Sequence, residues 1–443
     1  MSPQLHLVGH DESPREATGS RLLDTPVVYP LLGERVPLAG PVGHDLAGHL
    51  AEYGERPSAA GRAGDALLEQ IEAAALSGRG GAHFPVARKW KAVLAAGGGG
   101  TVVANAAEGE PASAKDAALL QHRPHLVLDG LVAAAESLGA QDAVVWLHHG
   151  AHATHRALAK ALVERRSMLP HEPTVRIALA PDHYLSGESS AAVRALSGGP
   201  ALPTFRRTPA ATEGVHGRPT LVQNVETLAR VGLLARTGAV GTRASSLLTL
   251  VAGGRRVVVE LEAHEHLLDA VNAAVASRAI LPPPRPQAVL LGGYGGRWLP
   301  WALAENLPVD QQALKAAGAS LGAGIVALLP RTACGLAETA RLLGYLAASS
   351  AKQCGPCLFG LAAVAELAGY LAEGSADASD VTRLRRHAAE ITGRGGCHHP
   401  DGAIAMLGSA LIVFADDVAA HAAGRPCMGI GHSPVLPVGA VPE

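Results

Sequence analysis

The stretch TVVANAAEGEP, residues 101–111, sets the fold class of this chain. Its first four residues are apolar or β-branched and predict a short buried strand. Asn105, Glu108 and Glu110 follow the strand in a loop. Because ligands bind at the carboxyl ends of parallel strands, these side chains are candidates for a binding site. Two glutamates in one loop are equally typical of a solvated turn, and the spacing alone does not separate these two interpretations.

Strands and helices alternate on both sides of this stretch. Further buried strands are predicted at 143–147 and 175–179, and helices at 67–75, 115–138, 154–169 and 187–196. Such alternation is typical of βαβ units, which form a parallel sheet covered by helices. Residues 61–240 are therefore predicted to form one α/β domain.

The pattern changes after residue 245. Short β-like runs at 247–251, 257–261 and 289–291 surround one helix at 267–275, and predict a small α+β domain over 241–330. Four helices are predicted next, at 336–346, 358–371, 381–391 and 404–420, which suggests a compact bundle over 331–423. Residues 1–60 are predicted to be an irregular N-terminal extension, and residues 424–443 an extended tail.

The composition is that of a globular protein with several domains. Of the 443 residues, 48% are hydrophobic and 17% are charged, so the chain can bury more than one core. The formal charge of −2 provides no electrostatic basis for binding nucleic acid. The N-terminus does not resemble a signal peptide, and the longest apolar stretch, 316–330, is too short to cross a bilayer. We therefore expect a cytoplasmic protein with no transmembrane segment of its own.

Three of the five cysteines are grouped in a pattern that suggests a metal or redox site. Cys354 and Cys357 form a Cys-Gly-Pro-Cys tetrapeptide, and Cys397 follows 40 residues later. A thiol redox pair would sit between a strand and a helix, but the preceding segment has a helical pattern. A zinc site would usually have a second cysteine pair. An iron–sulfur cluster, held by the close pair and the distant thiolate, is the preferred interpretation. Cys334, in an apolar segment, is expected to be a buried structural residue.

A glycine-rich loop, Gly78-Arg79-Gly80-Gly81, is a second candidate site. Without Cβ atoms its backbone N–H groups can approach a phosphate or a flat ring, although many such loops are merely tight turns. Lys89 follows shortly after and is one of only six lysines in the chain. An ammonium group is a natural partner for a phosphate, so the lysine strengthens the interpretation as a phosphate site.

Four motifs occur in the order known from one family: GRGGAHFP (78–85) with Lys89-Trp90, NAAEGEP (105–111) with Lys115-Asp116, YLSGE (184–188), and GRPT (217–220) with QNVET (223–227). From about residue 67 to residue 411 the chain resembles the NADH-binding flavoprotein subunit of respiratory complex I. It also resembles the related subunits of NAD-linked hydrogenases and formate dehydrogenases. The resemblance implies a Rossmann-like FMN-binding domain, a ubiquitin-like β-grasp domain of the SLBB-like kind, and a C-terminal helical bundle that carries a [4Fe–4S] cluster.

The resemblance also implies roles for individual residues. Positions that surround the flavin in the family fall at Gly78, Arg79, Gly80, Gly81, Lys89, Asn105, Glu108, Tyr184, Gly187, Glu188, Asn224 and Thr227. Positions on the NADH side fall at Phe84, Glu110 and Arg206. The cluster ligands fall at Cys354, Cys357 and Cys397.

The cluster motif departs from the family's pattern at its first cysteine, which is replaced by Ala351. Three thiolates could hold a [3Fe–4S] centre. They could also hold a [4Fe–4S] centre with a fourth ligand from His398, Cys334, Cys427 or a small molecule.

Further departures lie mainly on the NADH side, where a glycine, two aromatic residues and two acidic residues are replaced by His83, Ala92, Pro209, Ala107 and Ser189. We expect the His83 imidazole to project toward the flavin or the nicotinamide. Lost aromatic stacking, about 1 kcal/mol per contact beyond the buried area, predicts that NADH binds weakly.

The leading hypothesis is a flavo-iron–sulfur oxidoreductase, resembling NADH dehydrogenase (diaphorase), that passes electrons between FMN and the cluster. Its partner would be a ferredoxin or another redox subunit, and it would be cytoplasmic or peripheral to a membrane complex. One alternative is a non-catalytic homologue that acts as a scaffold or subunit of a redox complex. Another is a thiol redox protein that acts through Cys354 and Cys357.

Overall fold

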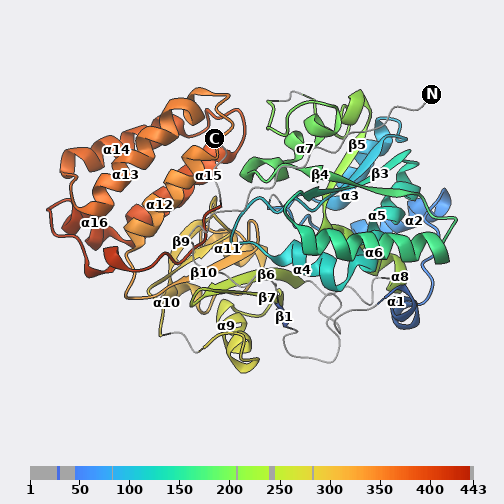
Figure 1. Cartoon of the computed structure of the whole chain (residues 1–443), viewed down its shortest axis with the longest axis horizontal. Coiled ribbons are helices and arrows are strands. Elements are labelled where there is room, and N and C mark those ends of the chain that lie inside the picture. The colour runs from blue at the N-terminus through green and yellow to red at the C-terminus, as the bar shows by residue number, and fades with distance from the viewer. Residues whose placement is uncertain are drawn as a thin grey trace, which may run out of the picture.

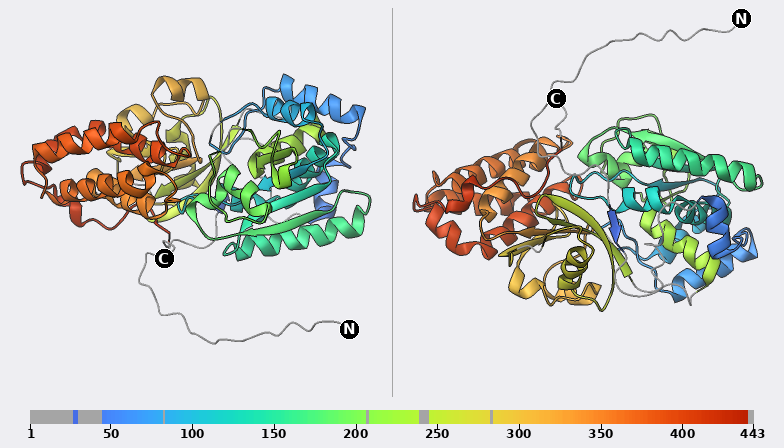
Figure 2. Two further views of the ribbon diagram at one scale, coloured as in Figure 1. Left: turned by 90° about the horizontal axis from the view of Figure 1, so that it is seen from above. Right: turned by 60° about the horizontal axis from the view of Figure 1, so that its bottom comes forward.

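The structure, a computed structural model, describes residues 27–29, 45–81, 83–205, 208–238, 245–281 and 284–439. These residues form two β-sheets and a group of C-terminal helices. The first sheet and its helices lie at one end of the molecule and the C-terminal helices at the other, as Figures 1 and 2 show.

The first sheet has four strands in the order β4-β3-β2-β5, and all neighbouring strands are parallel. They are β2 (Thr101–Asn105), β3 (Asp142–His148), β4 (Val175–Ala180) and β5 (Thr220–Asn224). This confirms the predicted parallel α/β sheet, although β5 is absent from the sequence prediction. The register pairs Asn105, at the end of β2, with Asn224, at the end of β5.

Helices cover both faces of this sheet. On one face α2 (Arg62–Ala73), α3 (Val86–Ala95), α5 (Pro124–Leu138), α6 (His152–Met168) and α8 (Val225–Thr237) share one apolar core with the strands. On the other face Val103, Trp146 and Val222 pack against α7 (Ser189–Leu196). The alternating side chains of each strand therefore enter two different cores, as expected for a parallel sheet that is buried on both sides.

Two predicted long helices are each divided into two. Residues 115–138 form α4 (Lys115–His122) and α5, because Pro124 has no amide hydrogen and biases Arg123 away from helical dihedral angles (φ −136°). Residues 399–421 form α15 (His399–Val413) and α16 (Ala415–His421), which meet at an angle of 85°.

The N-terminal residues are more regular than predicted where the structure describes them. Strand β1 (Val27–Tyr29) adds to the second sheet, parallel to β7. Helix α1 (Leu46–Tyr53) begins at Asp45, whose carboxylate accepts a hydrogen bond from Gly48 N, and its His49 pairs with Asp129 of α5 at 2.7 Å. The prediction of an irregular extension over 1–60 is therefore wrong for residues 46–53.

The second sheet is mixed, with the strand order β1-β7-β6-β10-β8-β9. Its other strands are β6 (Ser245–Ala252), β7 (Arg255–Glu262), β8 (Ala288–Leu291), β9 (Arg297–Pro300) and β10 (Ile325–Leu329). One face packs against α9 (Leu267–Ala276), α10 (Trp301–Ala304) and α11 (Gln311–Ala316). The opposite face, with Leu290, Ala327 and Trp298, packs against the C-terminal helices.

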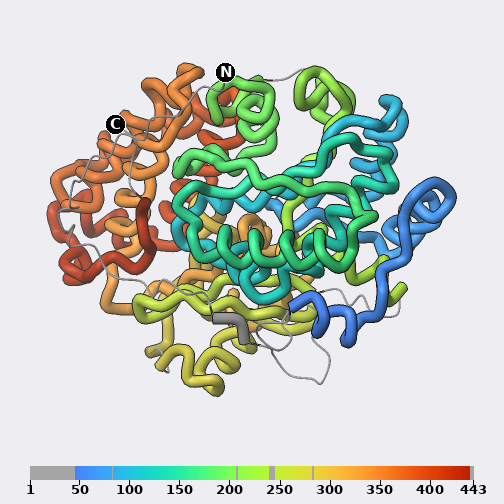
Figure 3. Tube along the Cα trace, turned by 45° about the vertical axis from the view of Figure 1, so that its right-hand side comes forward, coloured from blue at the N-terminus to red at the C-terminus, as the bar shows by residue number. Residues whose placement is uncertain are grey.

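The C-terminal helices are α12 (Gly335–Ala348), α13 (Leu361–Glu373), α14 (Ala378–Ile391), α15 and α16. Their apolar faces meet in one core, which includes Leu342, Val364, Leu384 and Leu407. In the tube view of Figure 3, as in Figure 1, these helices (orange to red) lie beside the first domain (blue to green).

One helical segment of the described residues, Pro356–Glu373, is long and apolar enough to cross a membrane, with a mean hydropathy of 1.3 over 18 residues. The bent pair of α15 and α16 passes the same test only if it is counted as one span. Buried core helices pass this test too, and Leu361, Val364 and Leu367 of the first segment lie in the C-terminal core. Length and hydropathy are therefore weak evidence for a span.

The close contact between α5 and α8 predicts how two glycine substitutions differ. A Cβ at Gly130 would lie 1.8 Å from the carbonyl oxygen of Leu228, so Gly130→Ala must push the helices apart and should cost about 1–3 kcal/mol. Gly344, an exposed glycine of α12, has no atom within 4 Å of such a Cβ, and Gly344→Ala should stabilise the protein by roughly 0.5–1 kcal/mol. Chemical denaturation of both variants measures the difference, and equal stabilities would contradict this close approach of the two helices.

Candidate functional site

The glycine loop lies over the first turn of α8. It connects α2 to α3 and is closed by an antiparallel bridge between Ser77 and Pro85. The backbone N–H of Arg79 donates to Thr227 Oγ1 at 2.8 Å, and a Cβ at Gly80 would lie 3.4 Å from the Asn224 side chain. The structure therefore brings together this loop and two residues predicted for the same site, Asn224 and Thr227.

The carboxyl ends of β2 and β5 carry the polar groups beside this loop. Asn105 Nδ2 donates to the carbonyl oxygen of Gly187 at 2.7 Å. Asn224 caps α8 by accepting from Glu226 N at 2.9 Å, and its amide donates to Asp116 Oδ2 at 2.6 Å. Gly187 has to be glycine, because a Cβ there would lie 2.2 Å from the carbonyl oxygen of Ala107. The predicted residues Asn105, Gly187 and Asn224 thus meet at the sheet edge where a ligand is expected.

Two of the predicted flavin-site carboxylates are helix caps. Glu108 accepts hydrogen bonds from Ser113 Oγ and from the backbone N–H groups of Asp116 and Ala117 at the start of α4. Glu188 accepts from Ser190 N and Ala191 N at the start of α7. Each carboxylate satisfies N–H groups that would lack an intrahelical partner, so both shape the loops around the site. Their contact with a flavin stays a prediction.

Lys89 is a largely buried cation at the same edge. Its Nζ donates to the carbonyl oxygen of Val222, in β5, at 3.1 Å, and burial lowers the pKa of Lys89. In the part of the chain that the structure describes, no carboxylate forms an ion pair with it. A buried ammonium is costly unless an anion compensates it, and a phosphate can supply that charge. The residues present therefore fit a phosphorylated cofactor.

A network of buried ion pairs lies behind the glycine loop. The Glu226 carboxylate lies 3.2 Å from Lys115 Nζ, 3.1 Å from Arg230 Nη2 and 3.9 Å from Arg79 Nε. Burial alone would raise the pKa of Glu226, but Lys115 and Arg230 lower it to about 2. Glu226 is therefore ionised at neutral pH, and its negative charge attracts the Arg79 guanidinium of the glycine loop. The sequence motifs contain Lys115 and Glu226, but nothing in them indicated that these residues pair.

Three of the positions predicted for the NADH side are exposed. Phe84 is 43% exposed, with the Arg88 guanidinium 5.4 Å from its ring centre. Ala92 and Pro209 are exposed, so no aromatic ring stands at either position. Arg206 lies outside the described residues.

His83 stands in a backbone conformation that favours glycine, with φ +48°, and neither ring nitrogen has a hydrogen-bond partner among the described residues. Its ring lines a cavity of about 300 Å³ together with Arg79, Arg230 and Ser246, whereas Lys89 and Asn105 do not line this cavity. Burial and the nearby Arg79 lower the pKa of His83. The imidazole therefore faces the buried ion pairs, which differs from the predicted direction toward a flavin or nicotinamide.

Glu110 joins the first domain to the second sheet. Its carboxylate accepts hydrogen bonds from Tyr294 N at 2.7 Å and Tyr184 Oη at 3.3 Å. Burial raises the pKa of Glu110 to about 7. The Tyr184 and Tyr294 rings each contact the Tyr345 ring edge-on, with centres 5.9 and 6.0 Å apart. Sequence reasoning placed Glu110 on the NADH side and missed Tyr294 and Tyr345, because these residues lie far from it in the chain.

The structure brings Cys354, Cys357 and Cys397 close enough for each thiol to affect the ionisation of another. Cys354 and Cys357 follow α12, at the start of the helical segment that leads into α13, and Cys397 precedes α15. Burial and the neighbouring Cys354 thiol raise the pKa of Cys357 to about 12. Burial alone would raise the pKa of Cys354. Hydrogen bonds from the backbone of Gly396 and Cys357 outweigh this effect and hold the pKa of Cys354 below its usual value. Three soft sulfur ligands from two segments fit an iron–sulfur cluster.

Two of the sequence candidates for a fourth cluster ligand lie elsewhere. Cys334 precedes α12, whereas the cysteine pair follows it, and a helix of 14 residues is roughly 20 Å long. Cys334 and Cys427 lie together near His421. They are thus at the wrong end of α12 to complete a cluster. His398 is exposed and directly follows Cys397.

The cysteine site adjoins the glycine-loop site. The His399 ring lies 5.4 Å from the Tyr184 ring, and its Nε2 lies 2.8 Å from the carbonyl oxygen of Leu346. Burial raises the pKa of Cys397, and the charge of Glu188 contributes to the same shift. The segment that carries the distant cysteine therefore packs directly on the YLSGE motif.

Two regions of the chain match known protein families. Residues 71–233 match the Nuo51 FMN-binding domain, and residues 331–421 match the NADH-ubiquinone oxidoreductase-F iron-sulfur binding region. Together the matches cover more than half of the chain, and they contain the glycine-loop site and the three cysteines, respectively.

Whole-chain relatives agree with these matches. The F 2 subunit of NADH-quinone oxidoreductase from Rhizobium meliloti (strain 1021) is 28% identical over 387 residues, which cover 82% of this chain and 90% of the relative. The corresponding F subunit from Streptomyces coelicolor (strain ATCC BAA-471 / A3(2) / M145) is also 28% identical, with 82% and 84% covered. The structure of an air-oxidized NAD+-reducing [NiFe]-hydrogenase superposes with a TM-score of 0.74 at 28% identity and covers 84% of this chain. This chain spans only 64% of that hydrogenase chain.

A parallel sheet with a cationic glycine loop, beside a group of three thiols, defines a flavin- and iron–sulfur-dependent oxidoreductase subunit. The chain belongs to the family of NADH-dehydrogenase flavoprotein subunits, whose two matched regions bind FMN and an iron–sulfur cluster. The predicted family and cofactors are confirmed.

Replacing Lys89 tests the flavin site. Lys89→Ala removes a charge-assisted contact worth roughly 1.5–3 kcal/mol, so FMN affinity should fall at least about tenfold. Lys91→Ala is the matched control, because Lys91 lies in the same helix, is exposed and pairs with Glu72 of α2. Fluorescence titration of the FMN-free protein measures both affinities, and equal affinities would rule out Lys89 as the phosphate partner.

Replacing cysteines tests the metal site. After anaerobic reconstitution, iron and sulfide counting with EPR should detect a cluster, which should be oxygen-sensitive and degrade to a three-iron form because Ala351 leaves one iron without its usual ligand. Cys354→Ala should lose this spectrum, whereas Cys427→Ala should keep its iron. A count below about two irons per chain, or an unchanged spectrum in Cys354→Ala, would contradict the ligand assignment.

Proposed function

We propose that this protein is a redox subunit that passes electrons between FMN in the first domain and an iron–sulfur cluster on the C-terminal helices. The packing of His399 on Tyr184 is the observation that carries this proposal, because it sets the segment of Cys397 against the edge of the flavin site. When bound, the flavin converts two-electron transfer into one-electron transfer. The protein supplies position and local charge for both cofactors.

Lys89 would hold the FMN phosphate, and the loop of Gly78, Arg79, Gly80 and Gly81 would present its backbone to the cofactor. The carboxyl ends of β2 and β5 support this placement, because Asn105 and Asn224 stand side by side there. Thr227 fixes the loop through its hydrogen bond to Arg79 N. Glu108, Gly187 and Glu188 hold the facing loops, and Tyr184 closes the side toward the cysteines.

Cys354, Cys357 and Cys397 would ligate the cluster, as a [4Fe–4S] or a [3Fe–4S] centre. Its fourth ligand would be His398 or a small molecule, because Cys334 and Cys427 lie at the other end of α12. Leu358 and Phe359 follow Cys357, and the Phe359 side chain is 71% exposed. An exposed aromatic beside the cluster supports docking of a redox partner, either a ferredoxin or another subunit of a complex.

The finer division into domains belongs to the same proposal. Residues 61–240 would form a Rossmann-like FMN domain, and residues 241–330 a β-grasp domain, supported by the mixed sheet with α9 across one face. Residues 331–423 would form the cluster-binding bundle, and 424–443 its tail. We place the protein in the cytoplasm, peripheral to a membrane complex.

NADH is proposed to be a weak electron donor to this subunit. The site has kept Phe84, but exposed Ala92 and Pro209 offer no ring for stacking, and Glu110 is engaged by Tyr184 and Tyr294. The flavin side of the site is better preserved than the nucleotide side. Another donor, reaching the flavin through a partner subunit, would then reduce this protein.

An absorption spectrum and an anaerobic NADH titration test the proposal together. The reconstituted protein should show flavin bands with a broad iron–sulfur shoulder, and dithionite should bleach the flavin while NADH bleaches it slowly. A colourless protein that retains neither cofactor would support the alternative of a non-catalytic scaffold. A colourless protein with a reducible Cys354–Cys357 disulfide would support the thiol redox alternative.

Replacing His83 tests whether this residue contributes to the slow oxidation of NADH that we propose. His83→Gly relieves the strained left-handed backbone directly before Phe84, so this turn can adjust to a nicotinamide and NADH oxidation should rise about tenfold, equivalent to roughly 1.4 kcal/mol of activation free energy. His216→Gly is the control, because His216 is exposed and has the same left-handed backbone, with φ +50°. Steady-state turnover measures both variants. Rapid turnover of the unmodified protein with NADH, at about 1–10³ per second, would show that these substitutions do not weaken NADH use.

A further inference from the structure

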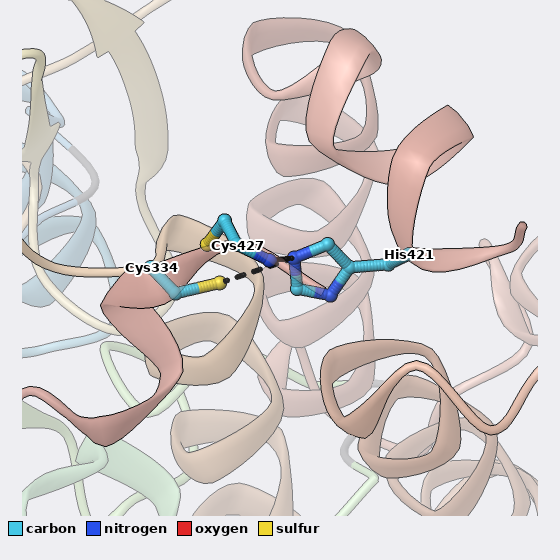
Figure 4. A group of neighbouring side chains, drawn as sticks. All are labelled: Cys334, His421 and Cys427. Atoms are coloured by element: carbon cyan, nitrogen blue, oxygen red, sulfur yellow. Dashed lines mark hydrogen bonds between the residues drawn. The ribbon is translucent and has the colours of Figure 1, made fainter. Parts of the chain in front are cut away.

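Two cysteines and one histidine that the proposed electron-transfer site does not use meet at the N-terminal end of α12. Cys334 is the N-cap residue of α12, His421 ends α16, and Cys427 belongs to the C-terminal tail. Their ligand atoms all lie within 4.8 Å of one another. Figure 4 shows the three side chains pointing toward one another. Cys334 and His421 are buried and Cys427 is partly exposed.

The hydrogen bonds of His421 fix which of its nitrogens faces the two thiols. Nδ1 lies 3.1 and 3.0 Å from the carbonyl oxygens of Leu371 and Ala372, which only accept hydrogen bonds, so Nδ1 carries the proton. The lone pair is therefore on Nε2, which lies 3.9 Å from Cys334 Sγ and accepts from Cys427 N at 2.9 Å. A histidine that donates one N–H to backbone carbonyls and turns its other nitrogen toward sulfur has the arrangement of a metal ligand.

The backbone also donates a hydrogen bond to the Cys334 sulfur. Ala337 N, in the first turn of α12, donates to Cys334 Sγ at 3.4 Å, and the N-terminus of a helix stabilises a thiolate. Burial and the neighbouring Cys427 thiol oppose ionisation and raise the pKa of Cys334 to about 12. The Cys334 thiol is therefore protonated without a metal, and a divalent cation would reverse that balance.

We propose that Cys334, His421 and Cys427 bind one zinc ion, which fastens the C-terminal tail to α12 and α16. Two thiolates and one imidazole are typical zinc ligands, and a water molecule on the exposed side of Cys427 would complete a tetrahedron. Binding releases one proton from each thiol, and the two thiolates neutralise the charge of Zn²⁺. A neutral complex suits a buried site, which would disfavour a net charge. The Cys427 amide gives up its hydrogen bond to Nε2 when the metal takes that lone pair.

The tail that the metal would hold packs against the rest of the molecule. Beyond Cys427, Leu436 N donates to Glu338 Oε1 at 2.7 Å, and the Tyr294 hydroxyl donates to the carbonyl oxygen of Pro437. Tyr294 also contacts Glu110 through its backbone N–H. The zinc would therefore stabilise the tail against the residues that join the three parts of the fold.

Zinc binding can be measured on the full chain with its iron–sulfur cluster in place. The protein, treated with a mild chelator and then dialysed against zinc, should hold one zinc ion per chain in addition to its iron. Cys427→Ser and Cys334→Ala should each weaken zinc binding by at least about a hundredfold. Losing a residue that only hydrogen-bonds to a metal ligand typically lowers metal affinity about 10–100-fold, and losing the ligand itself should cost more. Met428→Ala is the matched control, because this neighbouring side chain is 98% exposed, and it should bind zinc like the unmodified protein.

Cobalt and heat provide readouts that do not depend on activity. The difference spectrum on adding Co²⁺ should show thiolate-to-cobalt charge transfer and tetrahedral d–d bands, and both should disappear in Cys427→Ser. Zinc should raise the melting temperature of the unmodified protein and leave that of Cys427→Ser unchanged. Cys427→Ser is the safer of the two ligand variants because the residue is partly exposed in the tail.

Three outcomes would overturn the proposal. The unmodified protein could fail to retain zinc. Zinc could be lost in Cys354→Ala and kept in Cys427→Ser, which would place the metal on the cluster cysteines. Mass spectrometry could find a Cys334–Cys427 disulfide in anaerobically purified protein, which would make the pair a thiol redox site instead. Loss of FMN or of the cluster with zinc retained would overturn the proposed electron-transfer function and leave the zinc proposal standing.

Discussion

The Glu226 carboxylate, buried in the first turn of α8, is the interaction on which the arrangement of the site depends. It contacts Lys115 of α4, Arg230 of its own helix and Arg79 of the glycine loop, and accepts from Leu247 N of β6 at 3.1 Å. One charge thus contacts the glycine loop, the first residue of α4 and strand β6 of the second sheet. Without it, Lys115, Arg230 and Arg79 would each lose one anionic partner, and removing one member of a buried pair typically costs about 3–5 kcal/mol. The glycine loop owes its position to this network as much as to its own glycines.

A second junction, around Glu110, brings the cysteines to the flavin side. Tyr184 belongs to the first domain, Tyr294 to the second sheet and Tyr345 to α12, and their rings meet around the one carboxylate. Close packing on this scale leaves the three parts little freedom to slide. Because His399 packs on Tyr184 from the same side, the distance between the two cofactor sites is set by side-chain packing rather than by a flexible linker.

Local patterns in the sequence account for most of the elements, and contacts distant in sequence account for what they miss. The strands at 101–105, 142–148 and 175–180 follow from runs of apolar, largely β-branched residues, as does the helix–strand alternation. Strand β5 was missed because a proline precedes it and its residues belong to a family motif rather than to a plain apolar run. The break at Pro124 was missed because it lies inside an otherwise continuous apolar stripe. In the site, the sequence singled out Lys89 and the cysteine pair as candidates. Cys334 and His421 are 87 positions apart in the sequence, so their grouping depends on the fold and has no local signal.

The backbone at position 83 shows how this site has changed. His83 keeps φ +48°, a conformation in which a side chain is strained and glycine is not. The strain persists because the bridge between Ser77 and Pro85 and the hydrogen bond from Arg79 N to Thr227 fix the loop on both sides of it. Because the loop is fixed at both ends, its backbone conformation does not adapt to the side chain at position 83. The imidazole therefore occupies the cavity beside Arg79 and Arg230. The loop backbone that would contact a flavin can thus be retained while the side chains that would contact a nicotinamide are replaced. Flavin binding and the identity of the electron donor therefore depend on different parts of the site.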